Sequence, residues 1–245
     1  MSERYISNIP QEWIATRGRG AVIGVVETGC DEKHIDLQNS IVSCSEFGET
    51  NMTHGNHVIA TICGASRKPW VFNGLCTGAE VRVAKAALDK YHVMSNFKDA
   101  LLWLSSFDLD VLNLSLAYNI ESAEIKSILQ DIAMRSIIFS AYSATDRFPH
   151  SYDFVISVGY SEDHDCDLLG PKSIVSLIRG SNYGEMSGTS MSTAFASGVG
   201  GIARAYNKKI TAKEFVNAVR GAKLYQFDYQ KSVLNTSNKQ IIFKF

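Results

Sequence analysis

The most constraining feature of the sequence is the segment from Gly188 to Tyr206, which reads GTSMSTAFASGVGGIARAY. Alanine, glycine, serine and β-branched residues dominate it, as is typical of a helix that other backbones crowd on every side. Ser190 is expected in the first turn, where unpaired backbone N–H groups and the positive end of the helix dipole favour negative charge. A hydroxyl there suits a nucleophile whose reaction forms an oxyanion. The alternative is that Ser190 simply caps a buried helix, because serine is a preferred cap in any fold.

Two upstream segments add a carboxylate and a histidine. Residues 22–37 read VIGVVETGCDEKHIDL, and residues 54–58 read HGNHV. Together with the serine segment, they resemble the subtilisin-like serine proteases, in which an acid, a histidine and a serine follow one another in that chain order. The first matches the family pattern of strand, acid, Ser/Thr and Gly with a trailing Asp-x-x-His-x-Asp-Leu. The second matches His-Gly-Thr-His-Val with Asn in place of Thr.

The resemblance covers most of the chain, from about residue 10 to about residue 220. It implies that Ser190 is the nucleophile, that His54 is the general base and then the general acid, and that Glu27 orients the imidazole. The other two histidines of these segments, His57 and His34, are interpreted as structural hydrogen-bonding residues. The implied reaction is peptide-bond cleavage through an acyl-enzyme on Ser190.

The resemblance also implies a surface for an extended substrate. The family's Ser-Leu-Gly-Gly rim matches residues 115–118, which are Ser115, Leu116, Ala117 and Tyr118. Backbone pairing of this kind accepts many sequences, and side-chain pockets then select among them. Because Ala117 and Tyr118 replace glycines, we expect a narrower cleft and a restricted peptide or protein substrate.

Two departures from the family pattern concern the chemistry. Glu27 stands where the family has Asp, so its carboxylate is one methylene further from the backbone. The family's Ala-Ala-Gly-Asn aligns with residues 140–143, which puts Ser143 in the place of the oxyanion-hole Asn, beside the Ser190 N–H. A well-placed donor of this kind is worth about 10²–10³ in turnover.

Three functions therefore remain open. The first is a sequence-selective serine endopeptidase. The second is a peptide ligase or macrocyclase that passes the same acyl-enzyme to an amine. The third is a pseudoprotease that binds peptides or proteins and has lost catalysis as Glu27 and Ser143 diverged.

The order of apolar segments predicts one α/β domain over residues 1–245, with a doubly wound, mainly parallel sheet flanked by helices on both faces. Expected strands cover residues 21–26, 81–87, 110–116, 136–141 and 154–159. A helix is expected to start over residues 54–62, and further helices are expected over residues 95–105, with Ser95 as cap, 122–134 and 210–219. Residues 1–20 are expected to be a surface lead-in with a short helix, and residues 226–245 a tail that ends in an edge strand at 239–245.

Composition limits the partners. The net charge is −1, which gives no reason to expect nucleic acid, and no apolar run or leader indicates a membrane. The oligomeric state is not indicated, and no cofactor is implied. The chain also starts at Met1 without the family's long propeptide, so we expect it to fold unaided.

The five cysteines are odd in number and spread along the sequence, which favours reduced core thiols over disulfides or a metal site. They are Cys30, Cys44, Cys63, Cys76 and Cys166. A cytoplasmic location follows as an expectation.

No calcium site is predicted. In many relatives an Asn-rich loop after the histidine helix holds calcium, but residues 65–70 read ASRKPW here, with two cations where oxygen ligands would be needed. EDTA should therefore leave the melting temperature and the activity unchanged. Thermal unfolding and activity assays with and without EDTA test this, and a drop of several degrees that calcium restores would contradict it.

Overall fold

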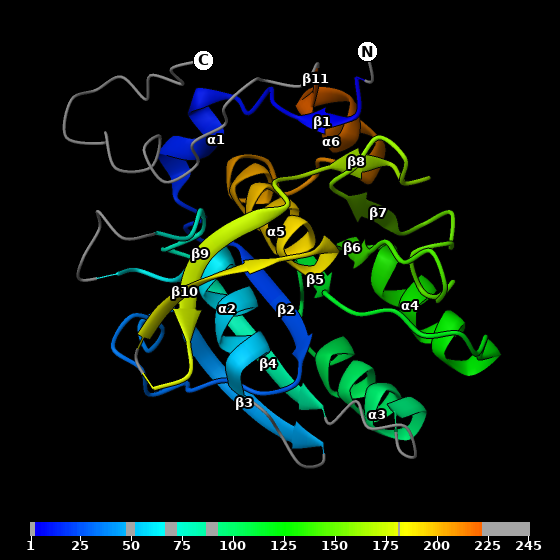
Figure 1. Ribbon diagram of the computed structural model, residues 1–245, viewed down its shortest axis with the longest axis horizontal. Helices are drawn as coiled ribbons and strands as arrows, with labels where there is room; N and C mark the ends of the chain where they lie inside the picture. The colour runs from blue at the N-terminus through cyan, green and yellow to red at the C-terminus, as the bar shows by residue number, and fades with distance from the viewer. Residues whose placement is uncertain (1–2, 48–51, 67–72, 87–92, 181, 222–245) are drawn as a thin grey trace.

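The computed structural model describes residues 3–47, 52–66, 73–86, 93–180 and 182–221 (Figure 1). The expected tail at 226–245, with its edge strand at 239–245, lies outside these residues. So do residues 67–70 of the segment that argues against calcium, and calcium independence stays a prediction.

The described residues form one large sheet and one hairpin. The strands are β1 (Tyr5–Ile6), β2 (Val22–Glu27), β3 (Ile41–Phe47), β4 (Glu80–Ala86), β5 (Val111–Leu114), β6 (Ile137–Ala141), β7 (Ile156–Gly159), β8 (Leu168–Leu169), β9 (Ser173–Ile178), β10 (Asn182–Ser187) and β11 (Arg220–Gly221). The sheet order is β11-β1-β8-β7-β6-β5-β2-β4-β3, and β9 pairs with β10. All neighbours in the large sheet are parallel except β1 and β11.

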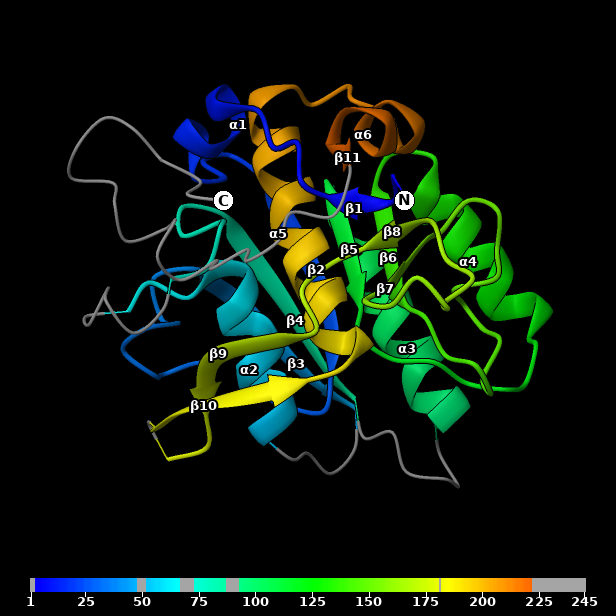
Figure 2. The ribbon, with the colours of Figure 1, turned by 45° about the horizontal axis from the view of Figure 1, so that its top comes forward.

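Helices cover both faces of the large sheet (Figures 1 and 2). They are α1 (Gln11–Thr16), α2 (Met52–Cys63), α3 (Val93–Ser105), α4 (Ala123–Ala133), α5 (Thr189–Tyr206) and α6 (Ala212–Val219). Buried side chains form two clusters: α1, α2, α5 and α6 contribute to one, and α3 and α4 to the other. The doubly wound, mainly parallel α/β architecture predicted from the sequence is therefore confirmed. Among the described residues, no helix is long and apolar enough to cross a membrane.

The central helix α5 is as crowded as its composition predicts. A Cβ atom on Gly200 would lie 2.6 Å from a ring carbon of Phe139, and one on Gly201 would lie 2.5 Å from the sulfur of Cys76. Glycine at these two positions lets α5 approach the sheet closely. The helix thereby carries Ser190 at its N-terminal turn to the edge of the sheet.

The five strands expected within the described residues all form, with ends shifted by at most two residues. Ser122 caps α4 by accepting a hydrogen bond from the Ile125 N–H. The predicted cap of α3 is wrong: this helix begins at Val93, so Ser95 lies inside its first turn.

Two further expectations are corrected. The lead-in is not wholly on the surface, because Trp13 of α1 is buried and its ring stacks on Phe215 of α6 with centroids 6.2 Å apart. The cysteines are spread along the sequence, but two of them meet in the fold: the sulfur atoms of Cys30 and Cys44 lie 4.0 Å apart.

Candidate active site

The candidate residues gather where parallel strands end. Glu27 is the last residue of β2, and Ser115 follows β5 directly. These strands are neighbours in the sheet, and Val26 of β2 pairs with Leu114 of β5. Since parallel α/β sheets place their ligands outside the carboxyl ends of the strands, this edge is where a site is expected.

His54 and Glu27 form a close pair. The Nδ1 atom of His54 lies 2.9 Å from both carboxylate oxygens of Glu27. The Glu27 side chain is only 2% exposed, and its Oε2 atom also accepts a hydrogen bond of 2.9 Å from the Thr28 N–H. The longer glutamate thus reaches the imidazole with both oxygens, and the His54 side chain keeps 33% of its surface exposed.

The first turns of α2 are locked to the loop after Glu27, which positions His54. A Cβ atom on Gly55 would lie 1.7 Å from the Gly29 carbonyl oxygen, so only glycine fits there. The Oδ1 atom of Asn56 accepts a hydrogen bond of 2.7 Å from the Asp31 N–H. Asn56 is the residue that departs from the family's threonine, and it fastens the helix to the loop.

Ser190 and Ser115 bind each other reciprocally. The Ser190 hydroxyl donates to the Ser115 carbonyl at 3.1 Å, and the Ser115 hydroxyl donates to the Ser190 carbonyl at 3.0 Å. The hydrogen bonds of the described residues do not include one between the Ser190 hydroxyl and His54. Both residues nevertheless lie at the same edge of the sheet, because His54 contacts Glu27 at the end of β2 and Ser190 contacts Ser115 after the neighbouring strand β5.

Sequence reasoning missed a buried residue beneath this pair. Asn113 lies on β5 with no exposed surface, and its amide nitrogen donates to the Ser115 hydroxyl at 3.1 Å. Its amide oxygen accepts a hydrogen bond of 2.9 Å from Ser197 of α5. A polar amide inside an apolar strand was the available signal, because buried amides require partners. Asn113 thus joins α5 to β5 and helps to fix the position of Ser190 along the sheet.

The histidine pKa values are shifted in opposite directions. Burial lowers the pKa of His54, but the hydrogen bond and the charge of Glu27 outweigh it, so the net pKa lies above 6.5. Burial dominates at His57 and lowers its pKa, although Nε2 lies 2.9 Å from the Ile174 carbonyl. His34 is buried too, and its Nδ1 accepts from the Asp36 N–H at 3.1 Å. His57 and His34 are thus placed as the structural residues that the sequence analysis expects.

Ser143 lies two residues beyond the end of β6, but its hydroxyl is engaged in its own turn. It accepts a hydrogen bond of 3.0 Å from the Asp146 N–H and lies 3.3 Å from an Asp146 carboxylate oxygen. For this hydroxyl to donate to an oxyanion, its proton must turn away from Asp146.

One of the four residues expected to line the substrate cleft, Tyr118, is engaged elsewhere in the fold. The backbone N–H of Tyr118 donates to the Phe148 carbonyl at 2.7 Å, and the Tyr118 carbonyl accepts from the Phe148 N–H at 2.9 Å. The Tyr118 ring is buried and packs edge-on against Phe97 with centroids 5.4 Å apart. Tyr118 is therefore part of the core, and its backbone is occupied. Leu116 and Ala117 are half-buried at the edge.

Comparison with known proteins decides the family. A model of the subtilase family matches residues 18–171 and 137–241. This chain belongs to the subtilase family. The resemblance drawn from the three motifs is thus confirmed.

Several curated subtilases are similar to this one. It is 27% identical over 213 residues to "Thermophilic serine proteinase" from Bacillus sp. (strain AK1), an alignment that covers 76% of this chain and 53% of that protein. It is 25% identical over 222 residues to "Intracellular serine protease" from Paenibacillus polymyxa, with 77% and 68% covered. The chain thus spans about half the length of the first relative.

A solved structure supports the fold. A cold adapted subtilisin-like serine proteinase superposes with a TM-score of 0.68, at 21% identity, over 82% of this chain and 81% of that one. The subtilase fold is therefore shared.

The pKa of His54 predicts a pH dependence for this subtilase. A general base must be neutral, so the rate at which a fluorophosphonate labels Ser190 should rise with pH through a midpoint above 6.5. Glu27→Gln should lower that midpoint, because the charge of Glu27 raises the pKa of His54 and the amide carries no charge. Labelling rates measured across the pH range test this, and a midpoint at or below 6.5 in the unaltered chain would contradict it.

The Glu27–His54 pair also makes the free energy of unfolding depend on pH. Because folding raises the pKa of His54, the pair's contribution to the free energy of unfolding is complete below the unfolded pKa of about 6.5 and is lost as the pH rises through the folded pKa. In denaturant unfolding, the difference in the free energy of unfolding between the unaltered chain and Glu27→Gln should therefore change as the pH rises through the folded pKa and stay constant above it.

The engagement of Ser143 predicts a mixed phenotype. Ser143→Ala should lower the free energy of unfolding by about 1 kcal/mol, because the hydroxyl holds its turn together. It should also lower turnover with little change in KM if the hydroxyl serves the oxyanion, whereas Ser143→Asn should keep or raise turnover. Denaturant unfolding and kinetics on a peptide selected from a library measure both effects. Unchanged turnover for Ser143→Ala would assign the oxyanion hole to another donor.

Proposed function

We propose that this subtilase is an active serine endopeptidase that uses Glu27, His54 and Ser190 as its catalytic triad. The observation that carries the proposal is the pairing of the His54 Nδ1 atom with both oxygens of the buried Glu27 carboxylate, at 2.9 Å. A carboxylate in this position fixes the imidazole tautomer and stabilises the imidazolium that forms during attack. A Glu in place of the family's Asp therefore retains the function.

In the acylation step, Ser190 attacks the carbonyl carbon of the scissile peptide bond. In the proposed step, its hydroxyl first turns from the Ser115 carbonyl toward the Nε2 atom of His54. His54 takes the proton as the bond to carbon forms and then gives it to the departing amine. Catalytic hydrogen bonds are often absent without substrate, so the resting bond of 3.1 Å to Ser115 is compatible with this role.

The negative charge of the tetrahedral intermediate needs donors. The backbone N–H of Ser190 lies in the first turn of α5, where backbone amides have no partner within their own helix. The positive end of the helix dipole adds to its effect. Ser143 is proposed as the second donor, once its proton turns from Asp146. Water activated by His54 then cleaves the acyl-enzyme.

The substrate is proposed to be a restricted peptide or protein segment that lies in extended form along Ser115, Leu116 and Ala117. Two hydrogen bonds join Ser115 to Ser190, and this contact supports a rim beside the proposed nucleophile. Because Phe148 occupies the backbone of Tyr118, the pairing surface ends one residue earlier than the motif suggests. A short rim recognises fewer substrate residues through the backbone, so side-chain pockets carry more of the selection.

We further propose that the protein works in the cytoplasm, on a peptide or protein partner and without a cofactor. Its five cysteines are free thiols. Two similar proteins, from Paenibacillus polymyxa and Bacillus subtilis (strain 168), are named intracellular serine proteases.

One observation favours a pseudoprotease as the second candidate. The Ser190 hydroxyl is bonded to the Ser115 carbonyl, and the engaged Ser143 hydroxyl weakens the oxyanion hole. If these bonds persist with a peptide bound, the site binds the peptide and does not cleave it. A ligase would use the active triad and differ only in the group that resolves the acyl-enzyme.

The active triad predicts a graded set of variants. Labelling by a fluorophosphonate should occur at Ser190 and be abolished in Ser190→Ala. Glu27→Gln should lower turnover by several orders of magnitude, since the amide analogue of a triad acid costs about 10⁴ in a well-studied serine protease. Glu27→Asp keeps the charge and should be less harmful. Intact-mass spectrometry after labelling and cleavage of a diverse peptide library measure these effects.

Ser192→Ala is the matched control, because Ser192 lies one half-turn along the same helix and its hydroxyl is bonded to the Pro171 carbonyl at 2.9 Å. It should still be labelled. The proposal fails if the folded protein neither reacts with the probe nor cleaves any peptide, and if Glu27→Asp combined with Ser143→Asn restores neither activity. Joined peptides among the products, instead of hydrolysed ones, would identify the ligase.

A further inference from the structure

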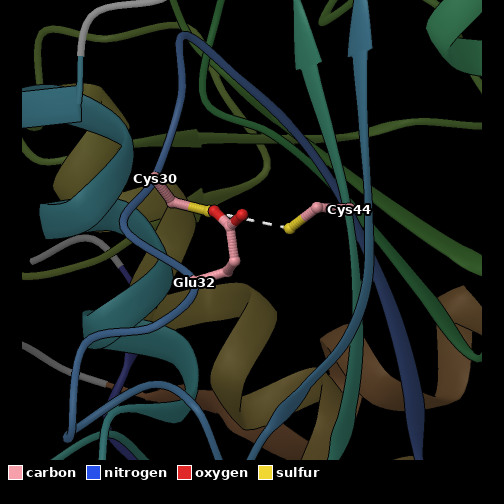
Figure 3. A group of neighbouring side chains, drawn as sticks. All are labelled: Cys30, Glu32 and Cys44. Atoms are coloured by element: carbon pink, nitrogen blue, oxygen red, sulfur yellow. Dashed lines mark hydrogen bonds between the residues drawn. The ribbon is translucent and has the colours of Figure 1, made fainter.

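A cluster of two cysteines and a buried lysine lies beside the proposed triad and takes no part in it. Cys30 is three residues after Glu27, and Cys44 is on β3. Their sulfur atoms are 4.0 Å apart, and Figure 3 shows them directed toward each other with the Glu32 carboxylate beside them. Cys30 has no exposed surface, whereas Cys44 is half-buried.

We propose that Cys30 and Cys44 form a dithiol–disulfide couple, with the half-buried Cys44 as the attacking thiol and the buried Cys30 as the resolving thiol. A disulfide needs its sulfur atoms at about 2 Å, so the two facing side chains must turn to bring their sulfur atoms together from 4.0 Å. The unequal exposure sets the roles, because an external reagent can reach Cys44 first. This proposal does not depend on the activity of the triad.

A buried ammonium group makes the site suited to a thiolate. Lys85 of β4 is 5% exposed and forms ion pairs with Glu32 at 2.6 Å and with Glu46 at 3.2 Å. The hydrogen bond from Cys30 lowers the pKa of Cys44, and the charge of Lys85 adds to it; together they outweigh burial and the charges of Glu32 and Glu46. The same hydrogen bond, together with burial, raises the pKa of Cys30. Thiolates are the reactive form of cysteine, so this asymmetry agrees with the roles set by exposure.

The step balances with a small-molecule disulfide, such as oxidised glutathione, as the oxidant. The Cys44 thiolate attacks one sulfur of the reagent, the reagent's S–S bond breaks, and one small thiolate leaves. Cys30 then loses its proton to solvent and attacks the Cys44 sulfur, which forms the Cys30–Cys44 bond and releases the second small thiolate. Two protein thiols are oxidised, and one small disulfide is reduced to two thiols.

A metal ion is the rival occupant. Ligand atoms of Cys30, Glu32 and Cys44 all lie within 4.8 Å of one another, and two thiolates with a carboxylate would suit zinc. However, the Lys85 ammonium already lies 2.6 Å from the Glu32 carboxylate and neutralises it. A divalent cation would have to displace this ammonium from a buried position, and the dithiol needs no such change.

The test combines alkylation rates with mapping of the linkage in the full chain. Cys44 should react with iodoacetamide faster than the other cysteines of the reduced protein. After treatment with oxidised glutathione, digestion and mass spectrometry should find the peptides of Cys30 and Cys44 joined, and lighter by two hydrogens than the separate thiol peptides. Dithiothreitol should reverse the linkage.

Variants separate the two roles. Cys30→Ser should leave a stable glutathione adduct on Cys44, since the resolving thiol is gone, and Cys44→Ser should leave Cys30 unmodified. Cys166→Ser is the matched control, because Cys166 is a buried thiol whose pKa burial raises to about 11, and its loss should not affect the linkage. Cys44→Ser keeps the test usable if the buried Cys30 position tolerates no change.

Two results would overturn the proposal. One is a Cys44 that reacts no faster than Cys166 and forms no linkage to Cys30. The other is one zinc ion that stays bound through gel filtration while both thiols are protected from alkylation, which would assign a metal site instead.

Discussion

The arrangement of the active-site edge depends on one buried carboxylate. A charged group that is 2% exposed is stable only if it is hydrogen-bonded, and Glu27 meets this requirement through Thr28 and His54. Glu27 and His54 therefore stabilise each other. Glu27 holds the imidazole in one orientation, and the imidazole, together with the Thr28 N–H, keeps the carboxylate from being an uncompensated charge. The position of α2 therefore follows from electrostatics as well as from packing.

Close contacts between backbones fix how α2 and α5 lie against the sheet and its loops. Gly55 allows α2 to meet the loop after β2, and Gly200 and Gly201 allow α5 to approach the sheet. Asn113 joins β5 to α5 through Ser197. These contacts restrict the distance between α2 and α5, so the geometry of the proposed active site results from close packing of backbones.

Local patterns in the sequence predicted what local forces determine. The apolar runs of β2 and β6 each depend on a few neighbouring residues, and the structure contains both strands. Strand β3 and the β9–β10 hairpin were missed, because polar residues interrupt their sequences and leave no continuous apolar run. The triad residues could be chosen from motifs.

Contacts between distant segments could not be predicted in the same way. The partner of the Ser190 hydroxyl depends on the register between α5 and β5, which no local pattern encodes. The burial of Trp13 depends on α6, some two hundred residues away in the sequence. The pairing of Tyr118 with Phe148 likewise joins two loops. Each of these facts changes a role that the motif alone assigned.

The Ser115 carbonyl connects substrate binding to catalysis in the proposed mechanism. In the resting structure it accepts the Ser190 hydroxyl, and in an extended complex the same oxygen is an acceptor for a substrate N–H. A backbone N–H held there by strand pairing competes for the lone pairs that the hydroxyl uses. Once displaced, the hydroxyl finds its next acceptor at the Nε2 atom of His54, whose basicity Glu27 has already raised. In the proposed mechanism, substrate binding would thus favour the orientation of the Ser190 hydroxyl that reacts.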